Sequence, residues 1–338
     1  MDEFDDSRLE NHEILRGADP LLIPLAESGA RLRREVSRAE LPLAGLSDLD
    51  RPRAVIAFGP EARLLRAVLE PVCPVPFMAW PALGLPGWVG PLDVVVVMGG
   101  RSRESMVVAH EAVRRGARLL VASPPDSSLA LQSASRSTTL LPIGTSDPLA
   151  SAILVLVALH RLGLGPAISP EAVADAMDAV AEECSWRNNV SANPAKAIAL
   201  DLAEAQPLVW GGSIMAARAS RRIAEALRAA SGRVCLAADA RALQPLLEGA
   251  APRDPFADPF EEAANDRRPG LVVIDDGLLD EAAEQDQDWL TKAALRQDIR
   301  VSLLRHTTGG AMERYVTILL QGLYAAAYLQ VGLGRTLS

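Results

Sequence analysis

Short apolar runs alternate with longer amphipathic stretches through most of the chain. Runs rich in β-branched residues predict strands buried on both faces, because parallel strands covered by helices read as continuous apolar segments. The clearest is DVVVVM at 93–98, which ends at Gly99-Gly100. The other predicted strands are 54–58, 75–79, 118–122, 207–210, 233–237, 271–274 and 300–304.

Apolar residues spaced three and four positions apart predict helices between these strands. The predicted helices cover 61–69, 102–115, 149–163, 170–184, 195–204, 214–230 and 313–331, after a helical lead-in within residues 1–50. A strand, a Gly-containing turn, a helix and a second strand form a βαβ unit. Its repetition predicts an open, doubly wound parallel sheet.

Each half of the chain opens with its own strand, Gly turn and helix. We therefore predict an α/β protein of two doubly wound parallel-sheet domains, each a sheet between two helical layers, with a C-terminal helix. The expected domains are 1–160, which includes the helical lead-in, and 161–338. The length agrees with two domains, because a single hydrophobic core rarely serves 338 residues.

Composition excludes several classes of partner. The net charge is -9 and aromatic residues are 4%, which argues against a nucleic-acid partner, since phosphate backbones require clustered positive charge and bases require stacking surfaces. The longest apolar run, 149–159, is shorter than a bilayer-spanning helix needs, so no membrane partner is expected. The acidic N-terminus has no apolar secretion segment, and the expected location is the cytoplasm.

Cofactor and metal motifs are absent from the sequence. No predicted strand is followed by GxGxxG, and the Walker lysine is missing, so no nucleotide cofactor is expected. The histidines are widely separated, without another ligand at metal spacing, so no metal site is expected. The thiols of Cys73, Cys184 and Cys235 are also far apart in sequence and predict reduced side chains.

Three predicted strand-to-helix turns could bind an anion, because a helix N-terminus presents unpaired N–H groups and the positive end of the helix dipole. Glu61 would repel phosphate at the first turn, and the second turn can be an ordinary one in which Ser102 caps the helix. The candidate phosphate- or sugar-binding residues at the three turns are Gly59, then Gly99, Gly100, Arg101, Ser102 and Ser105, then Gly211, Gly212 and Ser213.

Lys196 is a further candidate for the binding site. It lies in the first turn of a predicted helix, where its charge opposes the helix dipole. This placement suggests an anionic partner, and a solvated side chain is the alternative.

Several segments resemble the bifunctional phosphoglucose/phosphomannose isomerases, a family with two sugar isomerase (SIS) domains in one chain. The segments are DVVVVMGGRSRESMVVAHEAVRRGARLLVAS, NPAKAIALDLAEAQPLVWGG and GLYAAAYLQVGLG. GWVGPLDVVVV and NPAKAIAL are more similar still to the divergent actinobacterial branch called TobH. The resemblance implies a phosphorylated hexose ligand, conversion of glucose-6-phosphate or mannose-6-phosphate to fructose-6-phosphate, and a homodimer.

The family's catalytic Glu, His and Arg are not recognisable in this sequence. The first loop reads AFGPEAR, the segment 235–252 has no Asn-Glu pair or Glu-x-x-His phrase, and Asp147-Pro148 stands where the family has Pro-Arg. His306 and Glu248 are the remaining weak candidates for catalysis. The sequence therefore leaves three hypotheses open: an active isomerase, a non-catalytic phosphosugar-binding regulator, and a partner subunit that keeps only the fold.

Overall fold

A computed structural model describes residues 3–46, 50–81, 83–99, 102–144, 147–251 and 267–335. The chain forms two compact units, one of residues 28–174 and one of residues 1–27 with 175–338. We refer to them as the middle unit and the terminal unit. The boundary predicted after residue 160 falls within helix α8 (Pro148–Arg161).

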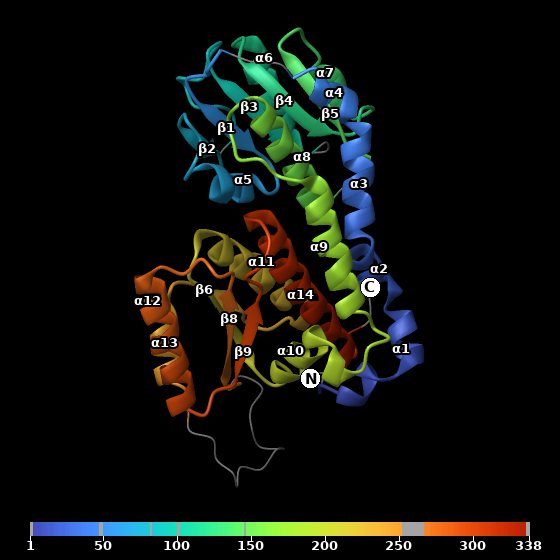
Figure 1. Ribbon diagram of the computed structural model, residues 1–338, viewed down its shortest axis with the longest axis vertical. Helices are drawn as coiled ribbons and strands as arrows, with labels where there is room; N and C mark the ends of the chain where they lie inside the picture. Colours follow the sequence, from blue (N-terminus) through green and yellow to red (C-terminus); the bar gives the residue numbers. More distant parts are fainter. Residues whose placement is uncertain are drawn as a thin grey trace. The chain divides into compact units, whose positions relative to one another are not determined.

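The middle unit contains a five-stranded sheet in which every pair of neighbours is parallel (Figure 1). The strand order is β2-β1-β3-β4-β5. All of β3 is buried, as its run of four valines predicts. The strands are β1 (Val55–Phe58), β2 (Phe77–Ala79), β3 (Val94–Met98), β4 (Arg118–Ser123) and β5 (Thr138–Pro142).

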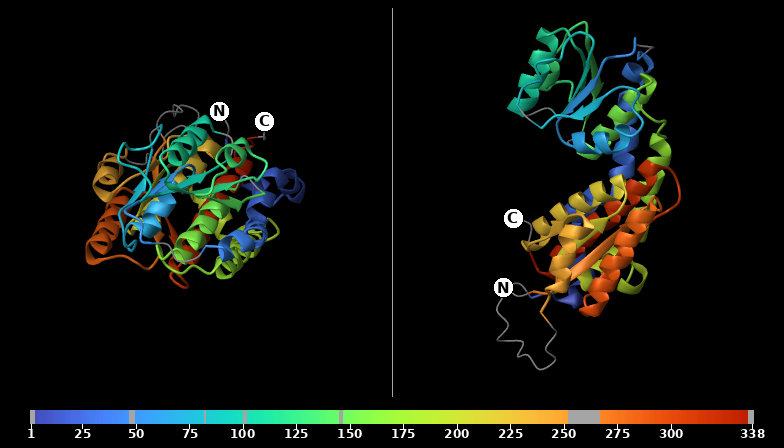
Figure 2. Two further views of the ribbon diagram at one scale, coloured as in Figure 1. Left: turned by 90° about the horizontal axis from the view of Figure 1, so that it is seen from above. Right: turned by 90° about the vertical axis from the view of Figure 1, so that its left-hand side faces the viewer.

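Helices cover both faces of this sheet. Figure 2 shows α6 and α7 on one face, with α5 and α8 on the other. One face packs a continuous apolar core between the strands and α6, whose inward residues are Val108, Ala109 and Ala112. The further helices of this unit are α3 (Ser28–Arg38), α4 (Glu40–Ala44), α5 (Ala62–Leu69), α6 (Arg103–Arg114) and α7 (Ser128–Gln132).

The terminal unit repeats the arrangement with a four-stranded parallel sheet of order β7-β6-β8-β9. In Figure 1, α12 and α13 lie on one face, and α10, α11 and α14 on the other. The strands are β6 (Gln206–Gly211), β7 (Leu236–Ala237), β8 (Pro269–Asp275) and β9 (Val301–Arg305). The helices are α10 (Pro194–Asp201), α11 (Ile214–Ser231), α12 (Ala240–Glu248), α13 (Glu281–Arg296) and α14 (Ala311–Gly332).

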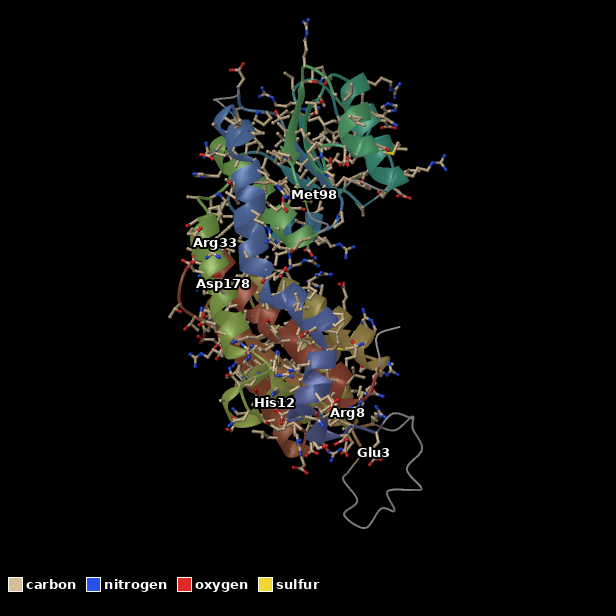
Figure 3. All side chains as sticks on the ribbon, turned by 90° about the vertical axis from the view of Figure 1, so that its right-hand side faces the viewer. Glu3, Arg8, His12, Arg33, Met98 and Asp178 are labelled. Carbon is tan, nitrogen blue, oxygen red and sulfur yellow. The ribbon has the colours of Figure 1, made fainter. Side chains whose placement is uncertain are left out.

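The terminal unit also takes up the N-terminal segment, which packs against α14. The main-chain N–H of Asp5 donates to the carbonyl of Gly332 at 2.9 Å, and Leu9 is fully buried. Figure 3 shows Glu3, Arg8 and His12 along this segment. Its elements are η1 (Asp6–Leu9), α1 (His12–Gly17) and α2 (Asp19–Ala26). Helix α9 (Pro170–Glu183) contains the boundary between the two units, and the short helix η2 (Val190–Ala192) lies between α9 and α10.

The predicted fold class is confirmed: two doubly wound parallel sheets, each between helical layers, with a long C-terminal helix. The predicted strand 233–237 is shorter than expected, because only Leu236 and Ala237 pair with β6. In the described part of the chain, no helix is both long and apolar enough to cross a membrane.

Candidate functional site

The topological switch point has the equivalent position in the strand order of each sheet. The strand order 2-1-3-4 is shared, so the crossovers diverge between β1 and β3 in the middle unit and between β6 and β8 in the terminal unit. Ligands of open α/β sheets bind beyond the carboxyl ends of such strands. The predicted turns at Gly59, Gly99 and Gly211 all lie at these positions.

At the first switch point, the two turns pack directly on each other. Gly59 has φ +114°, and a Cβ there would overlap the main-chain oxygen of Met98, the residue labelled at the end of β3 in Figure 3. Gly99 has φ +96°, and a Cβ there would contact the ring of Pro60 at 3.6 Å. Both positions therefore need glycine, and the close approach of the two turns joins them into one surface at the switch point.

Helix α6 begins at this surface with two hydroxyl groups. The Oγ of Ser102 accepts from the main-chain N–H of Ser105 at 3.0 Å, and the two Oγ atoms are 2.9 Å apart. Ser102 is thus the N-cap that the sequence offered as an alternative. The cap and a phosphate-binding role are compatible, since the remaining N–H groups of the first turn still point out of the helix. Gly100 and Arg101 lie outside the described residues.

A carboxylate lies on the other side of the first switch point. Glu61 occupies the N-cap of α5 with φ 61°, a left-handed conformation uncommon for a residue with a side chain, and it is 8% exposed. The carboxylate of Glu61 therefore already lies at the positive end of the α5 dipole, where a bound phosphate would otherwise be stabilised. We therefore expect α6, rather than α5, to offer the anion position of the middle unit.

The second switch point already contains an internal carboxylate. A Cβ at Gly211 would lie 2.5 Å from the main chain of Ala216, and one at Gly212 would lie 2.7 Å from Leu279, so this turn is tightly packed at both positions. Ser213 caps α11, and its Oγ donates to Oδ2 of Asp276 at 2.5 Å. Asp276 is 2% exposed and follows β8.

The comparisons with known proteins rest on the fold. The sequence matches no family model and no curated protein. The structure matches tagatose-6-phosphate ketose/aldose isomerase from Escherichia coli with a TM-score of 0.58 and 12% identity, covering 94% of this chain and 90% of that one. It matches glucosamine-6-phosphate deaminase from Thermotoga maritima with a TM-score of 0.56 and 12% identity, covering 96% and 95%.

A glucose-6-phosphate isomerase like protein from Thermus thermophilus gives a TM-score of 0.52 at 16% identity, with 88% of this chain and 91% of that one covered. The fold is that of the sugar isomerase (SIS) proteins. The likeness is one of fold and spans 88 to 96% of this chain. The finer assignment to the phosphoglucose/phosphomannose isomerase family or its TobH branch stays a prediction.

The carboxyl edge of the sheet in the terminal unit gathers several polar residues besides Ser213. Oδ1 of Asp276 accepts from the main-chain N–H of Leu278 at 3.2 Å, and Arg314 donates to the carbonyl oxygen of Asp276 at 3.0 Å. His306 is at the same edge, where its main-chain N–H donates to Asp275 at 3.0 Å. Sequence reasoning overlooked Asp276, although the run Asp275-Asp276-Gly277 directly after an apolar strand is the signal that could have identified it.

Glu248 lies at the opposite edge of the same sheet. It ends α12, a helix that begins beyond the carboxyl end of β7 and returns to the amino end of β8. Its carboxylate accepts from Gln244 at 2.6 Å and lies 3.8 Å from Arg296, which ends α13. The structure therefore does not bring Glu248 to the switch point or to His306.

Lys196 is almost completely buried in the terminal unit. Its ammonium group donates to the carbonyl oxygens of Trp186 at 3.1 Å and Asn188 at 2.7 Å, and lies 5.5 Å from the ring centre of Tyr328. Burial lowers the pKa of Lys196, and the charge of Glu10 opposes this effect. These contacts hold the loop before α10, and a role in sugar phosphate binding stays a prediction.

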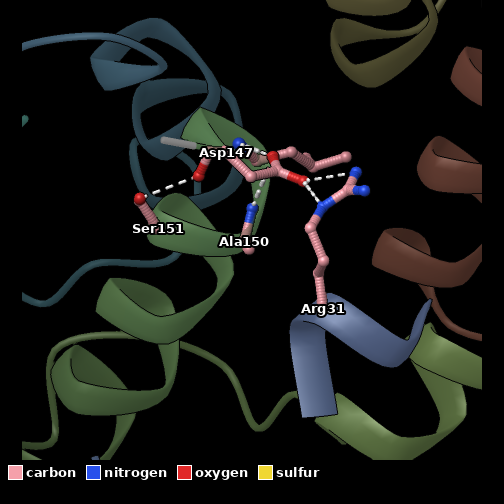
Figure 4. Close-up of polar contacts among 5 residues, drawn as sticks. Arg31, Asp147, Ala150 and Ser151 are labelled. Carbon is pink, nitrogen blue, oxygen red and sulfur yellow. Dashed lines mark hydrogen bonds and ion pairs between the residues drawn. The ribbon is translucent and has the colours of Figure 1, made fainter. Parts of the chain in front are cut away.

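Asp147 is a position at which the sequence departs from the family that it resembles. It caps α8 by accepting from the main-chain N–H groups of Leu149 at 2.9 Å and Ala150 at 3.3 Å. Its other oxygen accepts from Arg31 on α3 at 3.1 Å (Figure 4). The residue therefore organises the middle unit by joining two of its helices.

The described residues include no group of three or more His, Cys, Asp or Glu side chains placed to hold a metal ion. Two of the thiols are buried, and burial raises the pKa of both Cys184 and Cys235 to about 12. Neither is activated as a nucleophile, because the thiolate is the reactive form.

Proposed function

We propose that this protein binds a phosphorylated hexose, with the phosphate at the N-terminus of α6. The observation that carries the proposal is the contact between the turns after β1 and β3, which places Ser102 and Ser105 at the switch point of the middle unit. The solved proteins of the same fold support it, since they include proteins named for glucose-6-phosphate, glucosamine-6-phosphate and tagatose-6-phosphate. Gly100 and Arg101 would complete this phosphate loop.

The proposed reaction is the conversion of glucose-6-phosphate or mannose-6-phosphate to fructose-6-phosphate. Moving a proton between C1 and C2 requires a carboxylate base and an acid. Asp276 and His306 both lie at the carboxyl edge of the sheet in the terminal unit, so they are that unit's own candidates for a base and an acid. Glu248 is assigned neither role, because it lies at the other edge.

A non-catalytic phosphosugar-binding regulator, or partner subunit, is the second candidate. The hydrogen bond between Ser213 and Asp276 favours it, because this carboxylate is already engaged and almost completely buried. The isomerase and the regulator share the binding site and differ only in turnover, whereas a partner subunit that keeps only the fold would bind no phosphosugar.

Replacing Ser102 by Asp tests the phosphate site without removing the helix cap. Asp is as good an N-cap as Ser, so we expect the free energy of unfolding to change by less than about 0.5 kcal/mol. The added carboxylate would repel phosphate, and affinity for glucose-6-phosphate measured by calorimetry should fall by at least about tenfold. Ser127→Asp is the matched control, because Ser127 caps α7 in the same unit after a different strand.

Unchanged affinity of S102D, or equal stabilisation of the wild-type protein by glucose and glucose-6-phosphate, would contradict the proposed site. A coupled assay for fructose-6-phosphate then separates the two candidates. For an isomerase, Asp276→Asn should lower kcat by about 100-fold or more while Glu248→Gln keeps it. No product at high enzyme concentration, with phosphosugar binding retained, would favour the regulator.

The homodimer expected from the family resemblance is a separate proposal. Light scattering at micromolar protein concentration should give twice the mass of the 338-residue chain. A monomeric mass would contradict it and would leave the phosphosugar site unaffected.

A further inference from the structure

A helix that directly follows a parallel strand begins at the carboxyl edge of the sheet, and its N-terminus attracts an anion. In the terminal unit these helices are α11 after β6, α12 after β7, α13 after β8 and α14 after β9 (Figure 1). In the described part of this unit, a carboxylate of the protein already lies at the start of each of them. The helix N-termini of this edge therefore have internal anions.

At α12, α13 and α14 the carboxylate belongs to the helix or its cap. Asp239 and Asp280 are the N-caps of α12 and α13, and they accept from main-chain N–H groups of the first turn at 3.0 and 2.8 Å. Helix α14 begins after Gly310, and the carboxylate of Glu313 lies against this turn, because a Cβ at Gly309 would be 2.5 Å from its Oε2. These carboxylates stabilise their own helices.

At α11 the carboxylate comes from another strand. The N-cap Ser213 accepts from the main-chain N–H of Ala216 at 2.9 Å, and its Oγ donates to Oδ2 of Asp276 at 2.5 Å. Asp276 follows β8, and its Oδ1 accepts from the main-chain N–H of Leu278 at 3.2 Å. The residue is 2% exposed, and such a buried carboxylate needs donors and a positive potential around it. The N-terminus of α11 supplies that potential.

Asp276 lies where a ligand would lie at this switch point. The crevice between β6 and β8 is formed by the turns that follow these strands, and the bond from Ser213 to Asp276 joins the two turns. Side chains fill the remaining space, because a Cβ at Gly212 would be 2.7 Å from Leu279 and 2.9 Å from Ala283. A phosphate could enter only by displacing this carboxylate, whose charge would also repel it.

The middle unit differs at α6, where the cap is the hydroxyl of Ser102. Glu104 in the first turn is exposed, so solvent screens its charge. At the same edge, Glu61 occupies the start of α5 and Asp147 caps α8, while α7, also capped by a hydroxyl, has only five residues. Among the described helices of useful length that follow a strand, α6 is the one without a carboxylate at its cap.

We propose that Asp276 closes the terminal unit to phosphate, so that the chain binds one phosphosugar, at α6, although it has two switch points. Gly211, Gly212 and Ser213 then hold the internal carboxylate and no ligand. The part of the proposal that concerns α6 rests on the proposed function. The closure of the terminal unit does not, and it is measured separately.

The first experiment counts ligands by equilibrium dialysis of the full-length protein with radiolabelled glucose-6-phosphate. We expect one ligand per wild-type chain. Ser102→Asp should bind at least about tenfold more weakly and should show no second ligand, because the only open helix N-terminus now carries a carboxylate. Two ligands per wild-type chain, or one ligand bound to Ser102→Asp with wild-type affinity, would overturn the proposal.

The second experiment replaces the internal carboxylate by a free one. Asp276→Ala should lower the Tm and leave an enclosed space at the start of α11. Sodium formate at about 0.1 M should raise the Tm of this variant by about 2 °C more than sodium chloride does, because formate binds only the folded state. Asp239→Ala is the matched control, since it removes an exposed capping carboxylate from α12 in the same unit, and formate should act on it as chloride does.

The outcomes separate this inference from the proposed function. Equal effects of formate and chloride on folded Asp276→Ala would contradict the closure of the terminal unit. Rescue by formate, together with no glucose-6-phosphate bound by the wild type, would support the closure and contradict the proposed site at α6. If Asp276→Ala does not fold, the number of ligands bound to the wild type and to Ser102→Asp decides the proposal.

Discussion

At the scale of single residues, Lys196 shows that an unusual placement in the sequence can have a partner inside the protein. Its charge in the first turn of α10 opposes the helix dipole, and this suggested an external anion. The structure supplies two carbonyl oxygens from the preceding loop, and binding of an external anion stays a prediction. The sequence shows that the lysine lies in the first turn of a helix. The position of the loop before α10, which supplies the two carbonyl oxygens, depends on tertiary contacts that the local sequence pattern does not predict.

Lys196→Met should destabilise the protein by about 2 kcal/mol, because it removes hydrogen bonds from a charged donor to two carbonyl oxygens. Burial lowers the pKa of Lys196 in the folded state. The unfolded chain therefore binds this proton more tightly, and the contribution of Lys196 to stability rises as the pH increases from the lowered pKa towards about 10.5. Urea unfolding at pH 8 and pH 10 should show a larger deficit for the variant at the higher pH. A deficit that shrinks would contradict this assignment.

The three thiols should differ in reactivity with a disulfide reagent at pH 8. Burial raises the pKa of Cys184 and Cys235 to about 12, so almost no thiolate is present in the folded protein. Cys73 is only partly buried. We expect one thiol to react rapidly, and Cys73→Ser to abolish that phase. Rapid reaction of two or more thiols in the native protein would disprove the predicted burial.

At the scale of elements, the sequence was most informative where one pattern dominated. The valine run of β3 and the spacing of α6 were predicted to within one or two residues. The elements β5, α12 and α13 were not predicted. β5 reads TTLLP inside a Ser-rich segment, α12 contains Pro245, and α13 carries many polar residues, so the apolar pattern is weak in all three. Their formation depends on packing against neighbours.

Gly59→Ala should destabilise the junction between β1 and β3 by about 3 kcal/mol. The left-handed φ of +114° is costly for alanine, and its Cβ would overlap the oxygen of Met98. Gly87→Ala is the control, because nothing lies within 4 Å of the added atom and its φ is not left-handed. Equilibrium unfolding of both variants checks the difference. Equal stabilities would show that the two turns do not meet as described.

The candidate site could be predicted only in part. The turns after β1, β3 and β6 follow from the strand pattern, and all of them lie at switch points. The internal carboxylate Asp276 and the remoteness of Glu248 follow from the strand order, which places β8 between β6 and β9. Strand order is set by long-range packing, so residues 235–252 alone could not show that Glu248 points to the wrong edge.

At the scale of the whole molecule, the notable feature is that the terminal unit combines both ends of the chain. Leu9 of η1 is buried in the unit whose last helix is α14, and Asp5 bonds to Gly332. The apolar spacing of residues 9–32 predicts helices, but it carries no information about which sheet they cover.

Leu9→Ala should therefore destabilise the terminal unit alone. A fully buried leucine truncated to alanine costs about 3 kcal/mol. Hydrogen exchange followed by mass spectrometry should become faster in α14 and stay unchanged in β1, β3 and β4. Leu41→Ala, at a side chain 85% exposed on α4, is the control and should change neither region. Faster exchange in the middle sheet would contradict the division into these two units.

This division constrains the order in which the units can fold as the protein is synthesised. The middle unit uses one continuous stretch, residues 28–174, and its contacts are complete as soon as that stretch has left the ribosome. The first helices emerge earlier but must wait, with their leucines uncovered, until residues 311–332 have been translated. Until then the apolar side chains of these helices lack their partner, whereas the contacts of the middle sheet can already form.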